Sequence, residues 1–494
     1  MRSPKQVVSV SDFRVGRVFV YRRGRVWYLR YHQGGKRHQI RVSADKSAAR
    51  QLAAKVNAKL ETGEITTPSF KPLTIAQLRD QWLDHHEHVR RSSLQTVERY
   101  RTATQHLIRF IEKLPGRLRG AGNMTTDAVE EFVRWLRTIE VSPNGHANSR
   151  RRKLLDKGIV YVLDCCRSMF NFAIKRRQLP PYTDNPFSII QTDAITIENA
   201  KPIILLSLAQ EQQLLNACDD WDYPIFLTLM MTGLRPGELC HLLLPGDLNL
   251  DTGILRVSNK PRLGWQIKTR CDREVPLHPA VVAALRLVIG SRTTGAVFLR
   301  KQYANGMLAA HSWPSMEAME REVATRIASL EQERGQSLNR QEILTVQKTL
   351  WRDLGAIDED DTRRGFIRIC RKINMEHQTA PKLLRHGFAT MLQDANVDPL
   401  VRNLLMGHST SSSGSCVVRQ VGLGMTGVYT HTRAETMRRQ LMDAINLHGV
   451  LAGIKRLALM DSYSVKPEKN GSGSPQEPQA SPSPRPADSE SATY

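Results

Sequence analysis

The spacing of apolar residues changes along the amino-terminal 180 residues and predicts two kinds of structure. Between residues 73 and 177, four stretches carry apolar residues at three- and four-residue intervals, which predicts an all-helical segment. Between residues 17 and 42, three short runs rich in Val, Tyr, Trp and Ile are separated by glycines, which predicts three antiparallel strands joined by tight turns. An Ala-rich stretch at 43–61 then predicts one helix, with Ser43 as its N-cap.

Positive charge is concentrated in the predicted strands and helix. The 494-residue chain has a formal net charge of +23, and residues 1–60 hold fifteen Lys and Arg against Asp12 and Asp45. Such a field favours a polyanionic partner. No stretch approaches the uninterrupted apolar length of a membrane span, and the first residues lack the apolar core of a signal peptide. We therefore expect a cytoplasmic protein that binds nucleic acid and not membrane.

The seven cysteines argue against two common kinds of site. Their number is odd, their spacing is scattered, and no C-x-x-C pair occurs. This pattern disfavours both a disulfide framework and a zinc site. We expect incidental thiols in a reducing compartment.

Four groups of residues in the carboxy-terminal half carry the polar and nucleophilic side chains of a candidate site. Two runs at 253–259 and 265–277 also predict a β-hairpin, and Lys268 lies within it. The four groups are TGLRPGEL (232–239), KTRCDREVPL (268–277), KLLRHGFAT (382–390), and LLMGHS (404–409) followed by VYTHT (428–432).

Together and in this order, the four groups closely resemble the signature of the tyrosine recombinase (phage integrase) family. That signature contains TGLRxxEL, a hairpin lysine followed by RxVPL, HxLRHxFAT, LLGHS and YTH. A single match is weak, but four ordered matches are specific. The resemblance extends upstream, since residues 73–180 look like the core-binding domain of the family and residues 13–60 like the small arm-binding domain of its larger members. It therefore covers about residues 13–450.

The resemblance implies an α+β protein that acts on double-stranded DNA without a metal or nucleotide cofactor. Its domains would be an arm-type DNA-binding domain with a small three-stranded sheet plus helix, a helical, SAM-like core-binding domain, and a mainly helical catalytic domain with a small β-sheet. The expected boundaries are 1–62, 73–185, and 203–460 with an insertion at about 300–378. Residues 465–494 are rich in Pro, Ser, Gly and Glu, which predicts a disordered tail.

The chemistry of DNA breakage and rejoining explains the residue types of the signature. A tyrosine, here Tyr429, can store the energy of the broken bond in a phosphotyrosine. Arg235 and Arg385 suit the charge that gathers on two phosphate oxygens, because a guanidinium is always cationic and binds phosphate with two donors. Lys268 would protonate the leaving 5′-oxygen as general acid. His408 would donate a hydrogen bond to the phosphate.

The sequence departs from the family pattern in three places. Lys382 stands where the first histidine of HxLRH is usual, which leaves the proton acceptor for the tyrosine open. His408 and Tyr429 are 21 residues apart, more than is common in the family. A long stretch before Lys382 contains a charged amphipathic segment at 316–336, which could be a partner contact or a solvated surface helix.

Each assignment has a structural alternative. Arg235 could cap a helix or pair with Glu238, and Tyr429 could pack in a core. Lys268 could be a solvated lysine, with Lys260 as the nearest substitute. His408 could be a turn residue.

The resemblance implies integration or excision of a mobile element by a homotetramer on DNA, with accessory DNA-bending proteins as further partners. A predicted helix around 434–459 could be exchanged between subunits or pack on its own core. Two other functions remain open. One is a type IB topoisomerase-like enzyme, and the other is a catalytically impaired, sequence-specific DNA-binding protein.

Overall fold

The computed structural model describes residues 12–42, 45–63, 73–114, 119–142, 145, 148–179, 184–198, 204–408 and 433–457. Tyr429 and the predicted tail at 465–494 lie outside these residues. Ser43 also lies outside them, and the N-cap of the first helix is Asp45 and not Ser43, because the Asp45 carboxylate accepts from the N–H groups of Ser47 and Ala48. The chain divides into two units, Met1–Pro202 and Ile203–Tyr494. In the described ranges, no helix has the length and apolar character needed to cross a membrane.

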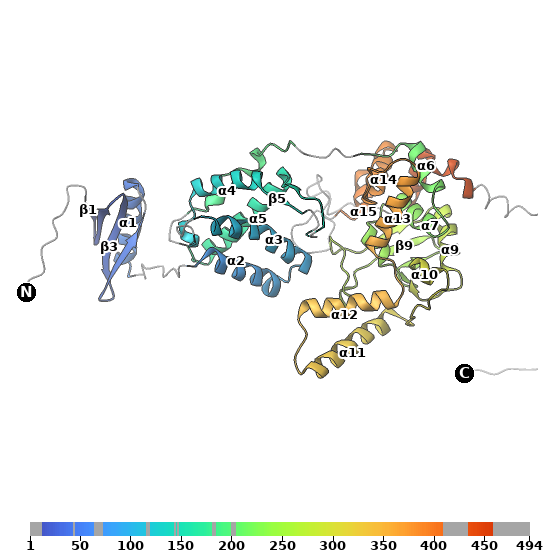
Figure 1. Ribbon diagram of the computed structural model, residues 1–494, viewed down its shortest axis with the longest axis horizontal. Helices are drawn as coiled ribbons and strands as arrows, with labels where there is room; N and C mark the ends of the chain where they lie inside the picture. The colour runs from blue at the N-terminus through green and yellow to red at the C-terminus, as the bar shows by residue number, and fades with distance from the viewer. Residues whose placement is uncertain are drawn as a thin grey trace, which may run out of the picture. The chain divides into compact units, whose positions relative to one another are not determined.

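The amino-terminal part of the first unit is an antiparallel sheet with one helix packed against it (Figure 1). The sheet has four strands and not the three expected, because a three-residue strand turns into the next through Gly16, which adopts a φ of +55°. A strand of three residues shows no clear alternation in sequence. The elements are β1 (Phe13–Val15), β2 (Val18–Arg23), β3 (Val26–Gln33), β4 (Lys36–Arg41) and α1 (Lys46–Glu61).

The two faces of this sheet differ in composition. Side chains that point toward α1 are apolar and buried, among them Val18, Trp27 and Leu29. The opposite face carries stacked aromatic rings and arginines, and the guanidinium of Arg30 lies 4.6 Å from the centre of the Phe19 ring. The small basic sheet therefore has one core face and one face of aromatic and cationic groups.

The second part of the first unit is helical, with a core centred on Trp82, Phe132, Phe170 and Phe187. One correction applies, since two short strands pair between α4 and α5, where an all-helical segment was expected. The charged run at 150–153 offers no apolar stripe for a helix, and strand pairing satisfies its backbone instead. The elements are α2 (Ile75–Asp84), η1 (His85–Val89), α3 (Leu94–Glu112), α4 (Thr126–Thr138), β5 (Glu140–Val141), β6 (Arg152–Lys153) and α5 (Asp156–Lys175).

The second unit surrounds one fully buried helix, α7 (Asp222–Thr232), in which every residue is buried. Small antiparallel sheets accompany the helices, so the predicted α+β fold class is confirmed. The other elements before residue 300 are α6 (Leu208–Asn216), α8 (Pro236–Cys240), β7 (Leu243–Leu244), β8 (Leu248–Asn249), β9 (Ile254–Val257), η5 (Pro261–Leu263), β10 (Arg273–Pro276), α9 (Pro279–Ile289) and β11 (Gly295–Ala296).

The remaining elements include a pair of helices that lie side by side at one edge of the second unit (Figure 1). This pair, α11 (Met316–Arg334) and α12 (Arg340–Asp353), lies in the predicted insertion and is called the α11–α12 hairpin below. The others are α10 (Lys301–Ala304), α13 (Glu359–Lys372), α14 (Lys382–Asp394), α15 (Pro399–Met406), α17 (Ala434–His448) and η6 (Val450–Gly453).

Two sequence predictions in the second unit need correction. Strands β9 and β10 do pair, but residues 258–272 between them form a long connection with its own 3₁₀ turn, so Lys268 lies in a loop and not on a hairpin strand. The predicted helix at 434–459 ends at His448, because Gly449 adopts a left-handed φ of +72°.

Candidate active site

The first group of candidate residues is placed by a turn at the end of α7. Gly233 has a φ of +61°, and a Cβ at this position would lie 2.2 Å from the Phe388 ring. Only glycine suits both conditions. The turn buries Leu234 and places Arg235 at the first position before α8, with its side chain one quarter exposed.

Arg385, on α14, is held by two helix ends. Its Nη1 donates to the Gly233 carbonyl at 2.5 Å, and its Nη2 donates to the Met406 carbonyl. Carbonyls at helix C-termini lack partners within the helix, so α7 and α15 offer acceptors that the guanidinium satisfies. Burial, with a contribution from the charge of Arg235, lowers the pKa of Arg385 to about 10, and the group remains cationic at neutral pH.

Glu238 joins two arginines from different elements. Its carboxylate accepts from the backbone N–H and the Nη1 of Arg235, at 2.9 and 2.6 Å. It also accepts two hydrogen bonds from Arg273 on β10, at 3.1 and 2.6 Å. Burial alone would raise the pKa of Glu238, but the hydrogen bond and charge of Arg273, followed by those of Arg235, lower it to about 2. The pairing of Arg235 with Glu238, which the sequence offered as a structural alternative, is present, and it is part of a larger cluster.

Arg273 is a site residue to which the sequence analysis assigned no role. Its Nε donates to the Leu405 carbonyl at 3.1 Å, so it ties β10 to the end of α15. A Cβ at Gly407, where φ is +60°, would lie 2.8 Å from the guanidinium of Arg273. The RxVPL motif contains Arg273, but only the folded structure reveals its bidentate pairing with Glu238.

His408 follows directly on Gly407 and faces the same arginines. The Nη2 of Arg385 lies 3.4 Å from Nε2 of His408. Since a guanidinium can only donate, Nε2 is the acceptor, and the proton of a neutral ring then lies on Nδ1. Burial, and then the charges of Arg385, Arg235 and Arg273, lower the pKa of His408, which favours this neutral form.

The arrangement suits a small oxyanion with more than one negative oxygen. Three guanidiniums against one carboxylate leave two positive charges in excess, and Arg235 is the most exposed of the three. Preorganised cations in a partly desolvated site stabilise developing negative charge strongly. Within the described part of the chain, no group of three His, Cys, Asp or Glu side chains could hold a metal ion. The cluster is therefore suited to bind a phosphodiester through its arginines.

The other predicted site residues lie around the cluster or outside the described residues. Lys382 is the exposed first residue of α14, one turn before Arg385. Lys268 is exposed in the turn closed by the N–H of Arg270 on the Ile267 carbonyl at 2.8 Å. No contact joins Lys268 to the arginines among the described residues. The position of Tyr429 is not described.

Lys260, the alternative to Lys268, is not available for chemistry. It is buried, and its Nζ lies 2.7 Å from Asp247 and 2.8 Å from the hydroxyl of Ser258. Burial lowers the pKa of Lys260 although Asp247 opposes this effect. This lysine serves the fold by pairing with a buried carboxylate.

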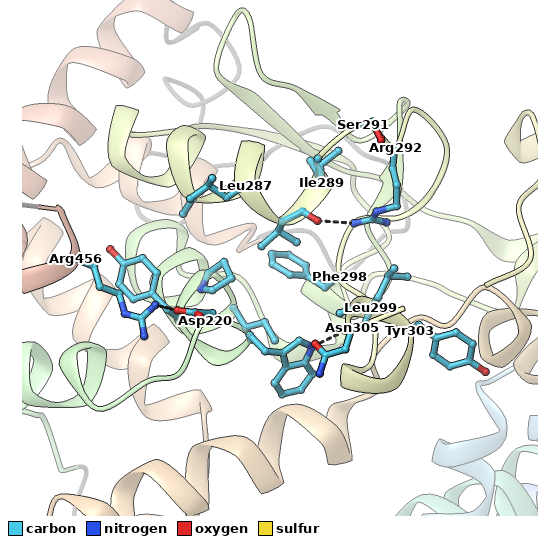
Figure 2. Close-up of a pocket in the computed structure, with 18 residues that line it drawn as sticks. Asp220, Leu287, Ile289, Ser291, Arg292, Phe298, Leu299, Tyr303, Asn305 and Arg456 are labelled. Carbon is cyan, nitrogen blue, oxygen red and sulfur yellow. Dashed lines mark hydrogen bonds and ion pairs between the residues drawn. The ribbon is translucent and has the colours of Figure 1, made fainter. Parts of the chain in front are cut away.

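A cavity of about 720 Å³ in the second unit lies between α7, α9 and α10 (Figure 2). Its two arginines are already engaged within the protein. Arg456 pairs with Asp220, and Arg292 donates to the carbonyls of Ala296 and Val297. None of the candidate site residues lines this cavity. We therefore place the chemistry at the arginine cluster and not in the cavity.

Comparison with known proteins gives the class. Residues 205–416 match the model of the Phage integrase family, and this range contains every candidate site residue except Tyr429. This segment of the chain is therefore similar to the phage integrase family.

Solved structures with a similar arrangement include integrases bound to DNA. The Tn1549 transposon integrase (residues 82–397) in complex with a circular intermediate DNA has a TM-score of 0.45 and 20% identity, covering 75% of this chain and 99% of that chain. A lambda integrase tetramer bound to a Holliday junction has a TM-score of 0.45 and 14% identity, covering 80% and 96%. No curated protein is significantly similar to the chain in sequence.

Proposed function

We propose that this protein is a site-specific DNA recombinase that integrates or excises a mobile element through a 3′-phosphotyrosine intermediate. The observation that carries the proposal is the cluster of Arg235, Arg273 and Arg385 around Glu238, with His408 beside it. It combines excess positive charge with fixed donors, inside the segment that is similar to the phage integrase family.

In the proposed reaction, Arg235 and Arg385 each donate to a nonbridging oxygen of the scissile phosphate. Both side chains are fixed before DNA binds, so little reorganisation is needed when charge develops. Glu238 and Arg273 act as positioning residues, because they contact the other arginines and the α15 end. Nδ1–H of His408 gives a further donor to the same phosphate.

The proposed covalent step exchanges one phosphodiester bond for another. The hydroxyl oxygen of Tyr429 attacks phosphorus and passes its proton to solvent water, while the bond from phosphorus to the 5′-oxygen breaks. Lys268 supplies the proton that the 5′-oxygen gains. Lys382 donates to a phosphate oxygen, and rejoining is the reverse of these steps.

Three domains would share the DNA contacts. Residues 1–62 would bind arm-type sites through the open sheet face, where Arg14, Phe19 and Arg30 neighbour one another across β1, β2 and β3. Residues 73–185 would hold the core site, and 203–460 would catalyse. A homotetramer on two duplexes, assisted by DNA-bending proteins, would complete the exchange.

A covalent-trapping assay tests the proposal. Integrases of mobile elements are often encoded beside their attachment site, so nicked duplexes tiled through the DNA on either side of the gene are the probe. We expect a protein–DNA adduct on a denaturing gel, formed without added metal and absent in Tyr429→Phe. Tyr303→Phe, a tyrosine at the cavity described above, is the matched control and should form the adduct.

Two results would count against the proposal. DNA binding without any adduct would favour a catalytically impaired DNA-binding protein, with Lys382 as the first residue to examine. Relaxation of supercoils on any plasmid, with no preference among the tiled duplexes, would favour a type IB topoisomerase-like enzyme.

A further inference from the structure

The α11–α12 hairpin packs directly on the loop that carries Lys268. The indole Nε1 of Trp351 donates to the carbonyl of Leu263 at 2.8 Å, and both residues are buried. The amide of Gln347 donates to the carbonyl of Arg262 at 2.8 Å. The Gln347 side chain also fills the space beside Gly264, where a Cβ would lie 2.7 Å from its Oε1. Two side chains of α12 thus hold three consecutive loop residues.

The same helix pair reaches α8, which begins at the catalytic arginine. His241, directly after α8, stacks on Trp265 with ring centres 4.0 Å apart and an interplanar angle of 5°. Trp351 contacts the same imidazole in a T-shaped arrangement, with ring centres 4.6 Å apart and an interplanar angle of 74°. Burial lowers the pKa of His241 to about 4, so the ring that contacts both indoles is uncharged at neutral pH. The aromatic group of His241, Trp265 and Trp351 therefore joins α8, the lysine loop and the hairpin.

The hairpin contacts add to those that hold the Lys268 loop on itself and on the core, where Asn259 donates to Asp272 and Ile267 is buried. Trp265 precedes Lys268 by three residues, so the two Cα atoms are at most about 11 Å apart. Between them, Ile267 is buried, and its N–H donates to Asn259 at 2.9 Å. Lys268 itself is exposed on the turn that follows. Contacts at residues 262–267 therefore determine where the lysine turn begins.

The charge of the hairpin argues against a role in binding the phosphate backbone of DNA. Residues 316–353 hold seven acidic and six basic side chains, in a chain with a net charge of +23. A phosphate-binding surface would carry clustered Lys and Arg. The buried side chains Met319, Val323 and Leu350 face the loop and its neighbours.

We propose that the α11–α12 hairpin is a positioning element for general acid catalysis, and that Gln347 and Trp351 hold the Lys268 loop in register with the arginine cluster. The inference rests on the proposed role of Lys268. It assigns the inserted helices a positioning role within their own chain, instead of the partner contact or solvated surface helix that the sequence left open.

Single-turnover cleavage of two matched duplexes tests this inference. Both carry the cleavage site found by trapping, and in one of them sulfur replaces the leaving 5′-oxygen. A thiol has a pKa near ~8.5, so the sulfur leaves without needing a proton from the protein. Saturating protein separates the chemical step from DNA affinity.

We expect Gln347→Ala and Trp351→Phe to cleave the oxygen duplex about tenfold more slowly, as misplacement of a reacting group does. Both variants should cleave the sulfur duplex at the wild-type rate. Gln332→Ala, an exposed glutamine on α11, is the matched control and should match the wild type on both duplexes. Gln347 is only partly buried, so Gln347→Ala should fold and can still be assayed if Trp351→Phe does not fold.

The outcomes separate the two proposals. Equal slowing on both duplexes, or no slowing on the oxygen duplex, overturns the positioning role of the hairpin. The cleavage rate of Lys268→Ala must also return to the wild-type rate on the sulfur duplex. If it does not, Lys268 is not the general acid, and the proposed mechanism fails together with the inference that rests on it.

Discussion

Replacing Glu238 with glutamine tests whether the arginine cluster is held together by this one carboxylate. Glu238→Gln keeps the shape of the side chain but removes its charge. Its amide would present N–H groups to Arg235 or Arg273, which are themselves donors only. Three cations would then lie together without a counterion, and the second unit should lose stability.

The magnitude follows from the pKa of Glu238. Its carboxyl falls from an ordinary 4.5 to about 2 in the folded protein, which corresponds to about 3 kcal/mol in favour of the folded state. Breaking a buried ion pair by removing one partner costs about 3–5 kcal/mol in other proteins, which agrees. We expect Glu238→Gln to lower the free energy of unfolding at pH 7 by about 3 kcal/mol.

The pH dependence has a definite sign. Because the folded-state pKa of Glu238 is depressed, its contribution is fully present above pH 4.5 and is lost as the pH falls toward 2. Glutamine cannot titrate. The difference between wild type and variant should therefore shrink to about 1 kcal/mol at pH 3.

Urea unfolding of the full chain, read at α14 by pulsed hydrogen exchange and mass spectrometry, measures the stability of the second unit. Glu274→Gln is the control, since Glu274 is an exposed carboxylate on the same strand as Arg273. It should change the free energy by no more than about 0.5 kcal/mol. A loss below about 1 kcal/mol for Glu238→Gln at pH 7, or a loss that persists at pH 3, would refute the reasoning.

Three further predictions concern the same surfaces. Gly407→Ala should lower the free energy of unfolding in urea by about 2 kcal/mol or more, because the backbone there is left-handed and the new Cβ would contact Arg273. Gly335→Ala also has a left-handed backbone but open space around the Cβ, and should lower the free energy of unfolding by about 1 kcal/mol. Arg30→Ala should weaken DNA binding and reduce its logarithmic salt slope by about 1, measured by fluorescence anisotropy; an unchanged slope would exclude the sheet face from phosphate contact. Since the pKa of His408 is lowered from 6.5, the ratio of wild-type to His408→Gln cleavage rates should stay constant above pH 6.5; a ratio that changes near pH 7 would show that the ring titrates there.

Sequence pattern predicted the parts of the fold that depend on local spacing. The helix at Leu94–Glu112 follows from the apolar periodicity of residues 73–177. The strand β1 was missed because three residues carry no period. Residues 265–272 of the loop at 258–272 were predicted as strand because Trp265 and Ile267 resemble alternating strand residues, although Ile267 is buried in the core and Trp265 is partly buried against the hairpin.

The site could be predicted only in part, for a physical reason. The motifs identify Arg235, Arg385 and His408 as separate residues, and the structure brings them together. Glu238 pairs with Arg273, which lies 35 positions later in the sequence. A pattern of neighbouring residues cannot predict a contact at that separation. The role of the hairpin is also long-range, since Trp351 donates to a carbonyl 88 residues earlier.

The arginine cluster shows how a protein can hold like charges together before its ligand arrives. Arg273 and Arg385 each donate to main-chain carbonyls at the end of α15, and Arg385 also donates to the end of α7. These carbonyls and the single carboxylate of Glu238 offset the mutual repulsion of the guanidiniums only in part, because two positive charges remain in excess. A phosphodiester brings one negative charge in the ground state and gains a second as the pentavalent transition state forms. In the proposed reaction, the charge left uncompensated in the free protein would therefore match the transition state better than the substrate, which is the condition for catalysis by differential binding.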